Sequence, residues 1–162
     1  MEISMKGTAL QTMGKVPKVG EKITDFKLYD KNSQVVCAHD LFDKLTLISV
    51  VPDINTRVCS ISTKRFNEEV DAFKGINFYT VSTNQPADQQ NWCAAEGVSQ
   101  MQLLSDKEAS FGKAFGLYEP TKNIDSRSVW IINDKQEVVY QEVIIEQVNE
   151  PNYQAALDFL KN

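Results

Sequence analysis

Pro52, Thr56 and Cys59 stand at fixed spacing directly after an apolar, β-branched run of the sequence. A thiol in the first turn of a helix can act as a nucleophile, because the unpaired N–H groups and partial positive charge of the helix start favour thiolate over thiol. Pro52 would turn the chain across such a thiol. Thr56 would either cap the helix or aim its hydroxyl at an oxygen held near the sulfur. The position of Cys59 alone is equally compatible with a small buried hydrophobe.

Two further cysteines differ in what their positions allow. Cys93 falls within a second expected helix that also follows an apolar strand. If both helices flank the same edge of one sheet, its thiol could reach Cys59 after a local rearrangement. Cys37 lies among short strands much earlier in the chain, and we expect it to fill space in the core. The pair Cys37 and His39 lacks a third and fourth ligand at usable spacing, so we expect no metal site.

Length and composition indicate one ordinary globular domain. The 162 residues are 42% apolar and 24% charged, and no repeat or linker divides them, so we expect a single domain over residues 1–162. The net charge of −5 and the lack of a Lys/Arg cluster argue against a nucleic-acid partner. No apolar run approaches the roughly 18 residues of a membrane span, and the N-terminus lacks the pattern of a signal peptide. We therefore expect a cytoplasmic protein with reduced thiols and no membrane contact.

Apolar periodicity and turn signals outline the elements that would position these thiols. Strands are expected within residues 1–15 (as a hairpin), 25–30, 34–42 (ending in a helical turn), 44–51, 76–82, 102–106, 128–134 and 137–145. Helices are expected over 59–73, 86–97, 106–116 and 151–161. The alternation predicts an α/β fold with parallel strands at its centre and an antiparallel pair at its edge. Sheets of this kind carry their active sites at the strand ends, where Cys59 falls.

Side-chain spacing gives finer expectations for the helices. The inward face of the helix over 59–73 should carry Ile61, Phe66, Val70 and Phe73. The inward face of the last helix should carry Tyr153, Ala156, Leu157 and Leu160. Pro86 suits a first helical position, and Gly75 and Gly97 suit helix ends.

Together, the proline, the threonine and the first of these thiols form the pattern P-x-x-x-T-x-x-C, which resembles the active-site motif of the peroxiredoxin family. The similarity is closest to its thiol peroxidase subgroup, the atypical two-cysteine peroxiredoxins. It extends to VGEKITDFKL, CSISTKRFNEE, Q-x-x-W-C-A-A-E-G, SRSVWIIND and EPNYQAALDFL, and so spans nearly the whole chain. The motif is fairly specific, and C-A-A-E-G downstream of it strengthens the resemblance.

The resemblance implies a role for each site residue. Cys59 would be the peroxidatic cysteine, framed by Pro52 and Thr56, and Cys93 the resolving cysteine. Arg127 matches the family's active-site arginine, although by itself it would be taken for a solvated charge at a strand end. The implied fold is thioredoxin-like. The implied activity is an antioxidant reduction of hydrogen peroxide and organic hydroperoxides without a cofactor. It would proceed through an intramolecular disulfide that thioredoxin reduces, in a protein that commonly forms homodimers.

Some residues depart from the subgroup's pattern. Arg57 stands where a small residue or proline is common, Gln85 and Ala87 replace apolar residues near the substrate groove, and residues 123–126 are more polar than usual. These changes weigh against a preference for bulky apolar hydroperoxides.

Three other functions are compatible with the fold class. A disulfide oxidoreductase would need C-x-x-C, which residues 59–62 lack. A thiol redox sensor without turnover and a purely structural module remain as alternatives to the peroxidase.

Overall fold

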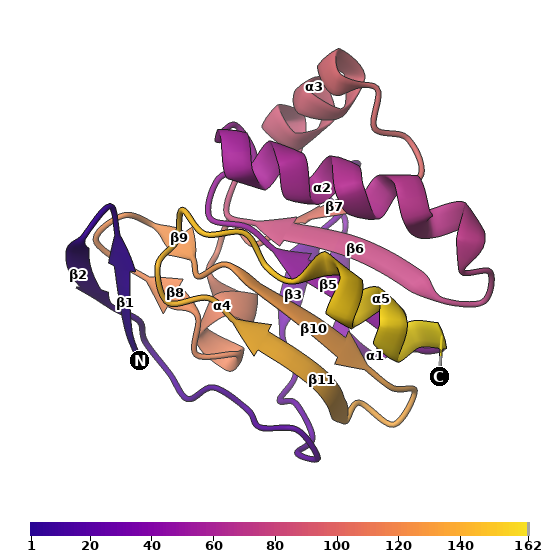
Figure 1. Cartoon of the computed structure of the whole chain (residues 1–162), viewed down its shortest axis with the longest axis horizontal. Helices are drawn as coiled ribbons and strands as arrows, with labels where there is room; N and C mark the ends of the chain where they lie inside the picture. Colours follow the sequence, from indigo (N-terminus) through magenta and orange to yellow (C-terminus); the bar gives the residue numbers. More distant parts are fainter. Residues whose placement is uncertain (162) are drawn as a thin grey trace.

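The computed structural model describes residues 1–161, and its main sheet has seven strands (Figure 1). In chain order they are β3 (Lys27–Tyr29), β4 (Val35–Cys37), β5 (Thr46–Val50), β6 (Asn77–Ser82), β7 (Gln102–Ser105), β10 (Ser128–Ile132) and β11 (Val138–Val143). Across the sheet the order is β11-β10-β5-β6-β7-β3-β4. β5, β6 and β7 pair in parallel, whereas β10 and β11 on one side and β3 and β4 on the other are joined by antiparallel pairing. The predicted parallel centre and antiparallel edge are confirmed.

Helices cover both faces of this sheet (Figure 1). They are α1 (Ala38–Leu41), α2 (Arg57–Glu69) with a following 3₁₀ turn (Val70–Ala72), α3 (Pro86–Glu96), α4 (Ser110–Ala114) and α5 (Tyr153–Lys161). α2, α3 and α5 share one apolar cluster with Leu47 and Ile131 of the sheet, and α1 and α4 share another with Ile48 and Trp130. Adjacent strand residues point to opposite faces, so Leu47 and Ile48 enter different clusters. All of β5 is buried, as predicted for a strand covered on both sides.

Two small hairpins complete the fold. The N-terminal hairpin of β1 (Glu2–Met5) and β2 (Thr8–Gln11) is confirmed. A second hairpin, β8 (Tyr118–Glu119) with β9 (Ile124–Asp125), was not predicted, because strands of two residues are too short to show an alternating pattern. It places β9 directly before the segment that enters β10.

Helix α2 differs from its prediction on one face. Phe66 and Phe73 are buried, but Ile61 is 39% exposed, so its predicted inward position is wrong. Ile61 precedes Phe66 by five residues, which turns it about 140° away around a helix. The helix ends at Glu69, continues as the 3₁₀ turn, and the chain leaves through Gly75 at φ 86°.

The other helices follow their sequence signals more closely. Pro86 occupies the first turn of α3, and Gly97 ends that helix at φ 69°, both as predicted. In α5, Ala156 and Leu157 are buried, whereas Tyr153 and Leu160 are half-buried. Helix α4 is shorter than predicted and covers only residues 110–114 of the segment 106–116.

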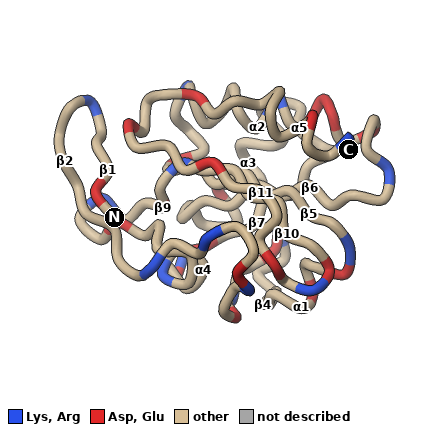
Figure 2. Tube along the Cα trace, turned by 60° about the horizontal axis from the view of Figure 1, so that its bottom comes forward, with Lys and Arg blue, Asp and Glu red and all other residues tan. Residues whose placement is uncertain are grey.

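The chain surface carries mixed charge. Figure 2 shows Lys and Arg interspersed with Asp and Glu along the trace. No helix within residues 1–161 combines the length and apolar composition that crossing a bilayer requires.

Candidate active site

The segment between β5 and α2 is held at the carboxyl edge of the parallel strands. Val51, Pro52 and Ile54 are buried. Asn84, which follows β6, accepts a hydrogen bond from the Ile54 backbone N–H at 2.9 Å and donates to the Asp53 carboxylate at 3.1 Å. β5 and β6 run in parallel, so their ends meet at one edge, and Asn84 ties the two following loops together. The loop before α2 is therefore fixed from the neighbouring strand.

Cys59 lies in the first turn of α2 and is fully buried. The first hydrogen bond within the helix runs from Ser60 N–H to the Thr56 carbonyl at 2.9 Å. The N–H groups of residues 57–59 therefore have no acceptor within the helix, and they direct partial positive charge at the helix start. The structure places Cys59 at a helix N-terminus, as expected from the sequence.

Arg127 supplies a cation at the Cys59 sulfur. The guanidinium is buried, with only 3% of the residue exposed, and its Nη2 donates to Cys59 Sγ at 3.1 Å. Its Nε donates to the Gln147 carbonyl at 2.8 Å, and its Nη1 has no partner among residues 1–161. A charge-assisted hydrogen bond of this kind stabilises a thiolate, and the free Nη1–H groups can serve a second acceptor. Arg57, by contrast, is exposed at the start of α2.

Of the two sequence expectations for Thr56, the helix cap is wrong, whereas a hydroxyl near an oxygen held by the sulfur stays a prediction. Its side chain makes no cap bond to α2; its hydroxyl donates to the Asp53 carbonyl at 2.9 Å. With the hydroxyl hydrogen committed to that carbonyl, the Thr56 oxygen is left as an acceptor. It can receive a hydrogen bond from a hydroxyl group bound near the sulfur, rather than donate one.

Pro52 borders a hollow of about 280 Å³ at the same edge of the sheet. Its walls are Pro52, Asp53, Thr83, Asn84, Gln85, Asp88, Lys122, Asn123 and Ile124. Most of these side chains are polar. Gln85 is one of the residues that line the hollow, whereas Ala87 does not line it. The hollow next to the Pro52 turn is therefore hydrophilic.

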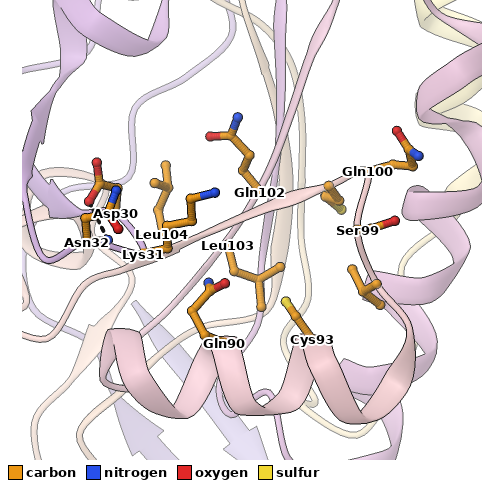
Figure 3. Close-up of a pocket in the computed structure, with 12 residues that line it drawn as sticks. Asp30, Lys31, Asn32, Gln90, Cys93, Ser99, Gln100, Gln102, Leu103 and Leu104 are labelled. Carbon is orange, nitrogen blue, oxygen red and sulfur yellow. Dashed lines mark hydrogen bonds between the residues drawn. The ribbon is translucent and has the colours of Figure 1, made fainter.

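Cys93 lies on α3 and faces a different hollow, of about 330 Å³, formed with β7 and the turn between β3 and β4 (Figure 3). Figure 3 shows its sulfur pointing from the helix toward Leu103 of β7. The side chain is half-buried, and burial raises the pKa of the Cys93 thiol. Cys37, Cys59 and Cys93 are all free thiols, so the structure does not join the two cysteines that the resemblance pairs.

Sequence reasoning missed two groups of residues around the site. Gln147 contacts Arg127 through both its side chain and its carbonyl, and a single glutamine after a strand carries no signal of such a contact. Asn84 had a weak signal, because it follows a central parallel strand and polar residues at such ends often serve a site.

The second missed group is a buried acidic pair beside the segment that leads to Arg127. Asp125 is fully buried, and no donor within residues 1–161 reaches either of its oxygens. Burial and the nearby Asp106 charge raise the pKa of Asp125 well above its usual value. Burial also raises the pKa of Asp106, although hydrogen bonds from Asp125 and from the Gly112 and Phe111 N–H groups act in the opposite direction. Of the two carboxyl groups, Asp125 therefore holds a proton more readily.

Comparisons with known proteins agree with this arrangement. The sequence profile of the AhpC/TSA family matches residues 19–141. The chain is 37% identical over 161 residues to the thiol peroxidase of Bacillus subtilis, covering 99% of this chain and 96% of that protein. It is 38% identical over 161 residues to the thiol peroxidase of Listeria innocua, covering 99% and 98%.

A solved structure extends the likeness to three dimensions. The peroxiredoxin-like protein from Aquifex aeolicus superposes with a TM-score of 0.91 at 26% identity, covering 99% of this chain and 95% of that one. The mixed sheet, flanking helices and N-terminal hairpin are thus the thioredoxin-like fold that the resemblance implied. With its profile matched over residues 19–141 and its thiol peroxidase relatives matched along almost their full length, the chain belongs to the AhpC/TSA family, in the thiol peroxidase group of the peroxiredoxins.

Proposed function

We propose that this chain is a thiol peroxidase that reduces hydrogen peroxide and organic hydroperoxides, with Cys59 as the peroxidatic cysteine. The observation that carries the proposal is the 3.1 Å hydrogen bond from buried Arg127 Nη2 to the Cys59 sulfur. A buried guanidinium on a sulfur at a helix start favours the thiolate, which is the nucleophilic form. Family membership supports the same activity.

The first step oxidises Cys59. The thiolate attacks one oxygen of the O–O bond in line, so that an S–O bond forms as the O–O bond breaks. The other oxygen leaves with the electron pair and takes up a proton, giving water from hydrogen peroxide or an alcohol from an organic hydroperoxide. The unpaired Arg127 Nη1 and the N–H groups at the start of α2 can stabilise the negative charge on that oxygen. The Thr56 oxygen can accept a hydrogen bond from the peroxide hydroxyl, and Pro52 shapes the loop around them.

In the second step of this proposal, Cys93 acts as the resolving cysteine. The Cys93 thiol displaces the hydroxyl of the Cys59 sulfenic acid, forming an intramolecular disulfide and releasing water. A disulfide requires Cα atoms within roughly 4.4–6.8 Å, and Cys59 is buried in a helical turn while Cys93 faces another hollow. The start of α2 and the end of α3 must therefore open locally before the bond forms.

Recycling requires an external dithiol. We propose thioredoxin as that reductant, through thiol–disulfide exchange at the Cys59–Cys93 bond. A cytoplasmic location and a homodimeric assembly belong to the same proposal, and both rest on the resemblance to thiol peroxidases.

A coupled assay tests the function. NADPH consumption is followed with thioredoxin, thioredoxin reductase and either hydrogen peroxide or cumene hydroperoxide. Steady turnover is expected for the wild-type chain, and Cys59→Ser should abolish it while the fold survives. A chain that consumes one equivalent of peroxide and then stops, with its disulfide passed to a partner protein, would instead indicate a redox sensor.

A further inference from the structure

Gln147 makes two hydrogen bonds to Arg127, whereas Cys59 of the P-x-x-x-T-x-x-C motif makes one. It lies in the loop after β11 and is buried, with 2% of the residue exposed. Its side-chain Oε1 accepts a hydrogen bond from the Arg127 backbone N–H at 2.6 Å, and its carbonyl accepts one from Arg127 Nε at 2.8 Å. One residue thus holds both the backbone and the guanidinium of Arg127.

The Gln147 amide is itself fixed in a single orientation. Its Nε2 donates to the Ile144 carbonyl at 2.8 Å, to the Ser126 hydroxyl at 3.1 Å and to the Ile145 carbonyl at 3.2 Å. Rotating the amide would put its NH2 group against the buried Arg127 N–H and leave that N–H without an acceptor, which costs about 1–3 kcal/mol. The Gln147 amide is therefore held in one orientation, in which it accepts the hydrogen bond from the Arg127 N–H.

The loop that carries Gln147 is in turn anchored to the N-terminal hairpin. Gln147 N–H donates to the Ser4 carbonyl at 2.9 Å, and Ser4 N–H donates to the Ile145 carbonyl at 2.9 Å. Glu146 accepts from the Ser4 hydroxyl at 2.6 Å. Strand β1 thereby holds the same loop that contacts Arg127.

We propose that Gln147 is a positioning residue for peroxide reduction, acting through Arg127. A guanidinium is planar, so holding Nε on the Gln147 carbonyl sets the direction of both Nη2, which contacts Cys59, and Nη1, which has no partner among residues 1–161. A displacement of about 1 Å in such a group can slow a reaction by as much as a hundredfold.

The test uses single-turnover oxidation of Cys59 in a Cys93→Ser background, with hydrogen peroxide as the probe and stopped-flow detection of its loss. Gln147→Met keeps the length of the side chain but removes its hydrogen bonds, and it should lower the second-order rate constant by about tenfold. Gln141→Met is the matched control. Gln141 also makes side-chain bonds to backbone, accepting from Val19 N–H and donating to the Pro17 carbonyl, and it pairs with Trp130 rather than with Arg127. It should leave the rate constant unchanged.

A double-mutant cycle separates positioning from general damage to the fold. If Gln147 acts through Arg127, adding Gln147→Met to Arg127→Gln should slow the reaction no further. An undiminished tenfold loss in the Arg127→Gln background, or a wild-type rate in Gln147→Met, would overturn the proposal. Should Gln147→Met fail to fold, Gln147→Ala removes the same side-chain bonds and is put through the same cycle.

The inference rests on the proposed peroxidase function, and the two fail in different ways. A wild-type chain that does not consume peroxide contradicts the function. A wild-type chain that does so, with Gln147→Met equal to it, contradicts only the role of Gln147.

Discussion

At the scale of single residues, Cys59 and Cys93 are the same side chain in two environments, and we propose that these environments set the order in which the two thiols react. Cys59 receives a hydrogen bond from a buried guanidinium at the start of a helix. Cys93 has no such cation among residues 1–161, and burial raises the pKa of its thiol, which disfavours the thiolate that reacts with peroxide. Peroxide should therefore oxidise Cys59 first, and Cys93 should react only once Cys59 has become a sulfenic acid.

Arg127 is expected to control the first step. Arg127→Gln retains hydrogen-bonding groups but removes the charge, and it should slow oxidation of Cys59 by about a hundredfold, the scale of losing one preorganised donor at a developing negative charge. Rapid mixing of reduced protein with hydrogen peroxide measures this. Arg57→Gln is the control, because Arg57 is exposed on α2. Equal effects of the two substitutions would show that general positive charge, not the contact with Cys59, is responsible.

Thr56 should act through its oxygen. Thr56→Val has nearly the same shape without the hydroxyl, and we expect it to slow the same step by about tenfold or more, within the range of other active-site hydrogen bonds. Thr56→Ser keeps the hydroxyl that donates to the Asp53 carbonyl and should restore most of the rate. If serine is as slow as valine, the methyl group rather than the oxygen is what matters at this position.

At the scale of elements, the proposed disulfide calls for a local change of shape in α2 and α3. Cys93 lies close to the C-terminal end of α3, which stops at Glu96 and turns through Gly97 in a left-handed conformation. Helix ends open at low free-energy cost, so this end of α3 can unwind more easily than its middle.

We therefore predict an intramolecular Cys59–Cys93 bond after peroxide treatment, with Cys37 still a free thiol. Non-reducing peptide mapping identifies the bond. Cys93→Ser should consume about one equivalent of peroxide per chain and then fail to turn over with thioredoxin. A Cys37–Cys59 bridge, or mainly interchain Cys59–Cys93 dimers on a denaturing gel, would show that the resolving assignment is wrong.

The elements that place these cysteines were largely predictable because their signals are local. The buried run of β5 and the proline and glycine that bound α3 each lie within a few residues of the structure they specify. Ile61 and the β8–β9 hairpin were not predictable in this way. An apolar side chain near the expected phase can still face solvent, and a two-residue strand has no period to detect.

At the scale of the whole molecule, the contacts that complete the site join segments far apart in the chain. Arg127 meets Cys59 across 68 positions, and Gln147 meets Arg127 across 20. The motif residues Pro52, Thr56 and Cys59 could be recognised together because they are close in sequence. Gln147 could not be, since its partners are set only once β10, β11 and the N-terminal hairpin have packed.

The Asp106–Asp125 pair is another product of this long-range packing, and it makes stability depend on pH. Asp125 ionises with more difficulty in the folded chain than in the unfolded chain, because burial and the Asp106 charge raise its pKa. Protonated Asp125 therefore stabilises the fold fully below about pH 4, the unfolded value, and this contribution is lost as the pH rises through the folded value. Lys113 interacts electrostatically with Asp106, and Tyr118 with both carboxyl groups of the pair.

Asp125→Asn cannot ionise, so the variant should be more stable than the wild type at pH 7–8 and gain nothing below about pH 4. We expect about 1–3 kcal/mol at neutral pH, the scale of leaving a buried acceptor without a donor, as the ionised Asp125 carboxylate would be, and urea unfolding across pH measures it. Glu119→Gln in the same hairpin is the control of opposite sign. Although burial raises the pKa of Glu119, hydrogen bonds from Thr121 and the Lys122 N–H bring it below its usual value. Its stabilisation is present above about pH 4.3 and is lost as the pH falls through the folded value, so Glu119→Gln should destabilise at neutral pH. If Asp125→Asn destabilises at every pH, the buried carboxyl makes a contact that an amide cannot replace.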